Sequence, residues 1–371
     1  MKQSFLLPFL VLLLSLSMIM SSCVPAATAV PTVPPAVEEP TIASPSATPA
    51  PSPTAEPTAT SAPREPISFV NPQAYSVEYK VTIRNDGFTL TDIRLYLPMP
   101  GEWEAQRDFK ITQVSPDPKS QGVEKNSGNA MIYWQLSGIP KKNTTEDFIL
   151  NFDLTAYETV TNIDPLTIQP YNTDTVEYKQ YTKDEKYIEA SDPEIVQLAS
   201  DLAKGETNPY LLAKTFYDYV IDTAHFELLG QGLNGAKYLL ENGKGEGGDY
   251  SALFIALSRA AGIPARPVVG YWAISGNDQT NVWAEFYLEN IGWIPVDATI
   301  GQQSAAKRAY YFGNMDNQRV ILSKGYNTAL VPPGPNNYIA PLLQVPTWWF
   351  WGSGDANKIS LDSSWTVIKN D

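Results

Sequence analysis

The spacing of apolar residues changes part-way along the chain, and this change most constrains the fold. In the stretch "YSVEYKVTIRN" apolar and polar residues alternate, which is the pattern of a half-buried β-strand. Asp86-Gly87 then marks a turn, and the alternation returns in "DFILNFDLTA". The apolar positions of these strands are Val77, Tyr79, Val81, Ile83, Phe148, Leu150, Phe152 and Leu154. We therefore predict a β-sandwich-like domain over residues 66–165, in which no residue spacing suggests catalysis.

Residues 189–335 carry helix signals followed by short strand patterns. Asp192-Pro193 and Asn208-Pro209 each place a capping residue before a proline at the first helical position. A third helix is expected from about Asp249 to Gly262, because Pro264 prevents its continuation. The segments "RPVVGYWAI", "VWAEFYLEN" and "WIPVDATIG" then have the pattern of strands. Helices followed by antiparallel strands predict an α+β domain.

The remaining residues, 336–371, form a C-terminal segment rich in aromatic side chains. The run "PTWWFW" is compatible with a stacking platform for a sugar or a peptide. It is also compatible with a staple that fastens the end of the chain to the core, which we favour because buried aromatic rings carry large apolar areas. The four rings are those of Trp348, Trp349, Phe350 and Trp351.

The N-terminus has the features of an export signal over residues 1–23. Lys2 precedes the apolar run "FLLPFLVLLLSLSMIM", and the small residues Ser21 and Ser22 lead to Cys23. This placement resembles a bacterial lipobox, which implies a lipid on the Cys23 sulfur and an anchor on the extracytoplasmic face of a cell membrane. Met20 stands where the lipobox pattern favours leucine. A plain signal peptide or an uncleaved anchor are the alternatives, although the run is short for a bilayer span.

Residues 24–65 are dominated by Pro, Ala, Thr, Ser and Val. Such a composition cannot bury enough apolar surface to build a core, so we predict a disordered, semi-rigid tether. A spacer of this kind after a lipid anchor would hold the folded part away from the membrane.

The charge balance excludes one class of partner. The chain of 371 residues has a formal net charge of −14, one Cys and one His. Without a basic patch it cannot neutralise phosphates, so we predict no nucleic-acid partner. For the same reason electrostatic docking on anionic lipid is disfavoured.

Gly243, Gly245 and Gly248 match the pattern G-x-G-x-x-G of dinucleotide-binding loops. That fingerprint needs a strand before the glycines and an acid about twenty residues later. Here "AKYLLEN" precedes the glycines with a helical pattern, and "IPARPVVGYW" follows without an acid. We therefore expect no nucleotide, and more generally no cofactor and no metal.

The same region resembles the transglutaminase-like superfamily, a papain-related α+β fold. The resemblance rests on "GGDYSALFIALSRAAGIPARPVVGY", "NVWAEFYLENIGWIPVDAT" and "YFGNMDNQRVILSKG", and it covers roughly Asp192 to Gly325. In that family a cysteine opens the helix, a histidine opens the strand that contains Trp-Ala-Glu, and an aspartate follows the next strand. The helix dipole and the nearby histidine favour the cysteine thiolate.

Two of these three groups are missing here. The resemblance places Gly247 at the cysteine position, Asn281 at the histidine position and Asp297 at the aspartate position. Glycine offers no nucleophile, and an amide cannot accept and return a proton as imidazole does. The surrounding family residues persist, namely Asp249, Tyr250, Trp283, Glu285 and Trp293. The resemblance thus implies a pseudoenzyme rather than an active transamidase or protease.

Three functions remain open at this point. The first is an open groove that binds a peptide, a protein or a cell-wall polymer. The second is a structural spacer or assembly unit of the envelope, formed by the α+β domain. The third alternative is a hydrolase with a relocated site, using His225 or the acids Asp249, Glu285 and Asp297. For the groove, the candidate ligand-binding residues are Gly247, Gly248, Asn281, Trp283 and Asp297.

Overall fold

The structure is a computed structural model that describes residues 65–371 apart from 231, 275, 277–278 and 371. The export signal, Cys23 and nearly all of the predicted tether lie outside the described residues. The rest forms one compact unit. None of the helices in the described part is long and apolar enough to span a bilayer.

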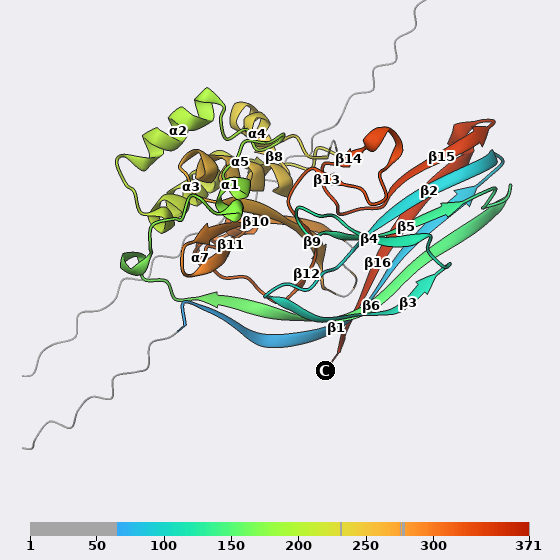
Figure 1. Cartoon of the computed structure of the whole chain (residues 1–371), viewed down its shortest axis with the longest axis horizontal. Coiled ribbons are helices and arrows are strands. Elements are labelled where there is room, and N and C mark those ends of the chain that lie inside the picture. The colour runs from blue at the N-terminus through green and yellow to red at the C-terminus, as the bar shows by residue number, and fades with distance from the viewer. Residues whose placement is uncertain (1–64, 231, 275, 277–278, 371) are drawn as a thin grey trace, which may run out of the picture. The chain divides into compact units, whose positions relative to one another are not determined.

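A β-sandwich of two four-stranded antiparallel sheets forms the first part of the fold (Figure 1). One sheet has the order β16-β1-β6-β3, with β16 (Ile359–Asn370), β1 (Ile67–Asn85), β6 (Thr144–Thr161) and β3 (Gln106–Ser115). The other has the order β15-β2-β5-β4, with β15 (Thr347–Ser353), β2 (Thr89–Met99), β5 (Ala130–Leu136) and β4 (Ser120–Val123).

The predicted alternation produces this sandwich. Strands β1 and β6 are neighbours in one sheet, and their apolar side chains lie side by side on the same face. Tyr79 pairs with Leu150 and Val81 with Phe148, and all four are buried. Burial of alternate residues on one sheet face is what the period of two requires. The sandwich prediction is confirmed.

The sandwich also contains residues that the sequence did not assign to it. Strands β15 and β16 lie in residues 336–371, the segment that the sequence sets apart at the C-terminus. However, β15 pairs with β2 and β16 pairs with β1. Each strand therefore forms an edge of one of the two sheets. Backbone pairing between strands so distant in sequence leaves no local signal, so only the folded chain reveals it.

The aromatic run is part of β15 and packs on the sandwich. Trp348 and Phe350 contact its core, and Phe350 meets Phe88 edge-on at 5.3 Å between ring centroids. Trp349 meets Tyr96 in the same way at 5.9 Å. Only Trp351 is exposed, with Arg94 lying over its ring. The packing of these rings thus holds the C-terminal part of the chain on the sandwich.

The second part is an α+β assembly, as predicted. Its main sheet has the order β11-β10-β9-β12, with β11 (Gly292–Val296), β10 (Thr280–Leu288), β9 (Ala265–Trp272) and β12 (Arg319–Lys324). Its helices are α1 (Val176–Tyr181), α2 (Pro193–Ala203), α3 (Pro209–Thr223), α4 (Ala236–Asn242), α5 (Gly247–Ala260), α6 (Ala298–Gly301) and α7 (Ala305–Tyr310). Short elements complete the described fold, namely β7 (His225–Phe226) with β8 (Lys244–Gly245), β13 (Thr328–Ala329) with β14 (Ile339–Ala340), and the 3-10 turns Pro165–Thr167, Pro335–Asn337 and Ala356–Lys358.

The helix ends follow the predicted signals. The Asp192 carboxylate accepts hydrogen bonds from the backbone N–H groups of the second and third residues of α2, and the Asn208 side chain does the same for α3. Helix α5 begins at Gly247, two residues earlier than expected, and almost all of it is buried. In Figure 1 the helices α2 to α5 gather on one side of the main sheet, and the long strands β1 and β6 pass on its other side.

The core of the sandwich extends into the second part. Tyr271 of β9 and Val320 and Leu322 of β12 are buried together with the sandwich residues. Trp365 of β16 stacks on Tyr271 with 4.5 Å between ring centroids, and its Nε1 donates to the Trp272 carbonyl at 3.1 Å. The C-terminal strand therefore joins the sandwich to the second part.

We expect Trp365→Ala to lower the free energy of unfolding by about 3–5 kcal/mol, because it leaves a large cavity at this junction. Trp351→Ala is the matched control, since that ring is 39% exposed, and it should cost less than about 1 kcal/mol. Urea unfolding followed by circular dichroism measures both. Equal effects of the two substitutions would contradict a role of Trp365 in joining the parts.

Candidate functional site

The glycines before α5 shape a turn. Gly243 has φ 66° and ends α4 in the left-handed conformation, which glycine adopts without steric cost. A Cβ on Gly245 would lie 2.9 Å from the Asp249 side chain, so only glycine allows this close approach. Asp249 in turn accepts hydrogen bonds from the backbone N–H groups of Asn234 and Gly235, both at 2.8 Å. These contacts account for Gly243 and Gly245.

Gly247 is the first residue of α5 and faces the start of β10. Its φ is not in the left-handed region, so backbone conformation does not demand glycine there. A Cβ at this position would lie 3.2 Å from the Val282 carbonyl oxygen and 3.5 Å from Thr299 Oγ1. A side chain at position 247 would therefore point toward the segment that contains Asn281.

Asn281 and Asp297 meet beside it. Asn281 lies near the start of β10, and its Nδ2 is 3.5 Å from Asp297 Oδ2, at the outer limit of a hydrogen bond. Asp297 directly follows β11 and caps α6 by accepting the Ile300 N–H at 2.9 Å. The fold thus brings Gly247, Asn281 and Asp297 together from three separate elements.

A cleft of about 660 Å³ opens at this point. Gly247, Gly248 and Asn281 line it, as expected for a groove at the start of α5. The other residues of its wall are mostly amide, hydroxyl or apolar side chains, including Trp272, Gln279, Thr280, Thr299, Gln302, Gln303, Leu342 and Gln344.

Two of the expected ligand-binding residues do not line this cleft. Trp283 lies in the wall of a second cavity, and the aromatic ring of the cleft is that of Trp272, at the end of β9. Asp297 is buried, and Arg319 Nη1 contacts its Oδ2 at 2.6 Å. Both residues were expected among the ligand-binding residues of the cleft, but neither side chain lines it. The sequence offered no sign of Arg319, which reaches Asp297 from β12.

The ion pair with Arg319 engages the carboxylate of Asp297, the residue at the third triad position. Burial lowers the pKa of Arg319, but the charges of Asp297 and Asp316 outweigh it and leave that pKa above its ordinary value. Arg319 therefore stays charged, and it also contacts Asp316 through Nη2 at 3.2 Å. The Asp297 carboxylate is a structural partner of this guanidinium in addition to its contact with the Asn281 amide.

The other acids considered for a relocated site are also engaged. Glu285 accepts from Arg266 Nε at 2.9 Å and from Lys324 Nζ at 3.0 Å. Burial alone would raise the pKa of Glu285, but the charges of Lys324 and Arg266 outweigh it and leave that pKa below its ordinary value. Because Glu285 is thus ionised at neutral pH, it lacks the proton that a general acid needs. His225 is exposed on β7 and lines neither cavity.

Comparison with known proteins places this geometry in a family. The profile of the transglutaminase-like superfamily matches residues 196–298, which include Gly247, Asn281 and Asp297. Residues 196–298 form a transglutaminase-like core. The fold and family implied by the sequence motifs are confirmed for this part of the chain.

Similar proteins extend the likeness beyond this core. A crystal structure of a candidate cysteine protease from Cytophaga hutchinsonii superposes with a TM-score of 0.56 and 16% identity, over 82% of this chain and 94% of that chain. This likeness concerns the fold alone. The periplasmic domain of TgpA from Pseudomonas aeruginosa is also 16% identical, covering 62% of this chain and 91% of that one, but its TM-score is only 0.31.

An uncharacterized protein of Haemophilus influenzae is 29% identical over 213 residues. The match covers 46% of this chain and 58% of the relative, so the chain spans a little more than half of that relative's length.

We expect Glu285→Gln to destabilise the fold by about 3–5 kcal/mol near neutral pH, because it leaves Arg266 and Lys324 buried without the carboxylate. The folded-state pKa of Glu285 lies below its ordinary value of 4.5. Its stabilising contribution is therefore complete above that value and is lost as the pH falls through the folded-state pKa. The free energy of unfolding, measured with urea, should therefore fall less between about pH 7 and about pH 3 for the variant than for the parent protein.

Glu194→Gln is the control, since this exposed acid also pairs with a lysine but at the surface, and it should cost at most about 1 kcal/mol. A loss below about 1 kcal/mol for Glu285→Gln, or an acid dependence unchanged from the parent protein, would contradict the assigned role.

Proposed function

We propose that this protein is a non-catalytic member of the transglutaminase-like superfamily whose cleft binds a peptide segment of an envelope protein or polymer. The observation that carries the proposal is the meeting of Gly247 and Asn281 in an open cleft, where the family places its nucleophile and its base. The scaffold around the two positions persists, but the reacting groups do not. Such a site retains binding surface without the means to form an acyl intermediate.

A substitute nucleophile lacks a base. The hydroxyl nearest to position 247 belongs to Thr299, 3.5 Å from the Cβ that Gly247 lacks. Asn281 is the polar side chain of β10 at this point of the cleft, and an amide does not take up the proton of a hydroxyl. The only cysteine of the chain is Cys23 in the export signal. These residues support binding rather than turnover.

The lining of the cleft favours an uncharged peptide backbone. Its polar side chains are mainly amides and hydroxyls, which offer both donors and acceptors. The two acids of the wall are already engaged, since Glu246 accepts from the N–H groups of Leu229 and Gly230 and Asp249 accepts from the turn before α4. Exposed Phe226, Leu228 and Val345 add apolar contacts for side chains of the ligand.

Gly247→Leu tests the proposal, with Gly247→Ala as the matched control. A methyl group fits at this position after a shift of a few tenths of an ångström, whereas the longer leucine side chain would project into the cleft. We expect a peptide selected from a random phage-displayed library on the parent protein to bind Gly247→Ala within about threefold of the parent. Binding to Gly247→Leu should weaken at least about tenfold, as measured by fluorescence anisotropy.

The peptide should remain uncleaved and should not incorporate an amine during incubation with the parent protein, as judged by mass spectrometry. Turnover of the peptide would refute the non-catalytic assignment. Failure to select any peptide, together with marked destabilisation of Gly247→Leu, would favour a structural spacer instead. A loss of about 1–3 kcal/mol is typical of overpacking a filled site.

We propose further that a lipid on Cys23 anchors the protein on the extracytoplasmic face of the membrane. The lipobox-like context of Cys23 and the long Pro-rich tether support this. Cys23→Ala should leave an unprocessed precursor, while Ser61→Ala in the tether should be processed like the parent. Mass spectrometry of the mature N-terminus distinguishes the outcomes, and an unmodified N-terminus well beyond Cys23 in the parent would contradict the anchor.

A further inference from the structure

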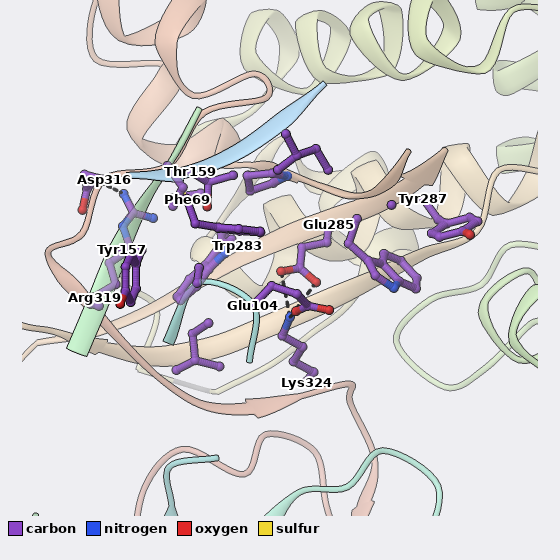
Figure 2. A pocket seen from close by; sticks show the side chains of 18 of the residues that line it. Phe69, Glu104, Tyr157, Thr159, Trp283, Glu285, Tyr287, Asp316, Arg319 and Lys324 are labelled. Atoms are coloured by element: carbon purple, nitrogen blue, oxygen red, sulfur yellow. Dashed lines mark hydrogen bonds and ion pairs between the residues drawn. The ribbon is translucent and has the colours of Figure 1, made fainter. Parts of the chain in front are cut away.

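A second cavity of about 470 Å³ lies between the sandwich and the main sheet of the transglutaminase-like part (Figure 2). It shares no lining residue with the cleft. Strands β1 and β6 form one wall, and strands β10, β11 and β12 form the opposite wall. Its volume falls within the range of about 300–1,000 Å³ that is typical of small-molecule sites.

Aromatic rings from both walls face this cavity. Phe69 comes from β1 and Tyr157 from β6, while the main sheet contributes Trp283, Tyr287 and Trp293. Figure 2 shows Phe69, Tyr157 and Trp283 close together at one end of the cavity, and Tyr287 toward the other end. Of these rings, only that of Trp283 is fully buried, so the others keep surface for a ligand.

Charged groups of both signs lie among the rings. The lining acids are Glu104, Glu177, Glu285 and Asp316, and the bases are Arg319 and Lys324. Both bases are buried and paired with acids, Arg319 with Asp316 and Lys324 with Glu285. Glu104 is different, because its side chain is 59% exposed and its nearest cation, Lys324 Nζ, is 3.8 Å away. In Figure 2 the Glu104 carboxylate lies beside that of Glu285, above Lys324.

The combination of aromatic rings with charges that are already paired disfavours charged ligands. An anion would meet more acids than bases, and the two bases already hold carboxylates. A cation would compete with the protein's own cations for the rings, since Arg266 lies 3.8 Å from the ring centre of Trp293 and Arg107 lies 4.6 Å from that of Tyr157. An uncharged ligand avoids both conflicts.

We propose that this cavity is a binding site for a neutral carbohydrate. The C–H faces of sugar rings can pack on the aromatic side chains, which bind through apolar area and oriented ring faces. Sugar hydroxyls both donate and accept hydrogen bonds. They can therefore donate to the exposed Glu104 carboxylate and accept from neighbouring donors, a versatility that neither a simple anion nor a simple cation offers.

The test uses the full chain in detergent and three tetrasaccharides that differ in charge. Cellotetraose is the neutral probe, tetragalacturonate the anionic probe and the glucosamine tetramer the cationic probe. We expect cellotetraose to bind in isothermal titration calorimetry and to change tryptophan fluorescence, and we expect the two charged tetramers to bind at least about tenfold more weakly. Absence of cellotetraose binding, or preference for a charged tetramer, would overturn the proposal.

Variants assign the binding to this cavity. Phe69→Ala and Glu104→Gln should each weaken cellotetraose at least about fivefold, because they remove a ring face and a charged acceptor. Glu102→Gln and Trp351→Ala are matched controls outside the cavity and should bind like the parent. Circular dichroism establishes that each variant is folded, and Glu104→Gln keeps the side-chain shape if Phe69→Ala does not fold. Unchanged binding by both cavity variants would overturn the site.

The experiment also separates this site from the cleft. Gly247→Leu changes the cleft and not the second cavity, so it should leave cellotetraose binding within about twofold of the parent. If Gly247→Leu abolishes the binding while Glu104→Gln does not, the carbohydrate occupies the cleft and the proposed site is wrong.

Discussion

The burial of helix α5 is the constraint on which the rest of the structure depends. From Gly248 to Arg259 every residue of this helix is buried, between the helices α2 to α4 and the sheet strands β9 and β10. A helix that is enclosed on all sides cannot shift without opening the core. Its first residue, Gly247, is therefore held against the start of β10, and this position creates the cleft.

Ion pairs hold the other side of the site. The family acids Asp297 and Glu285 lie on or next to the main sheet, and each is bound by basic side chains from neighbouring strands, Arg319 in one case and Arg266 and Lys324 in the other. A buried carboxylate is tolerated only when such partners satisfy it. These two acids thus join β12 and β9 to β10 and β11. Asp297 contacts Asn281, which lines the cleft, and Arg319, which lines the second cavity.

The two cavities differ in chemistry because different surfaces create them. The cleft forms within the transglutaminase-like core, at a helix end. Its wall is rich in amides, and the acids described in it, Glu246 and Asp249, are both engaged. The second cavity forms where the sandwich meets the main sheet, so rings from β1 and β6 face rings from β10 and β11. A sandwich joined to a transglutaminase-like core in this way adds a surface that neither part has alone.

The sequence by itself determined the class of each part and the residues that stand at the family's motif positions. Period-two alternation predicted β1 and β6, proline after a capping residue predicted α2 and α3, and the motifs around Gly247 and Asn281 identified the core, because all of these signals are local. Only the tertiary structure decided that β15 and β16 complete the sandwich, that Trp272 rather than Trp283 lines the cleft, and that Arg319 forms an ion pair with Asp297. These features depend on contacts between residues distant in the chain, where burial and pairing leave no periodic mark in the sequence.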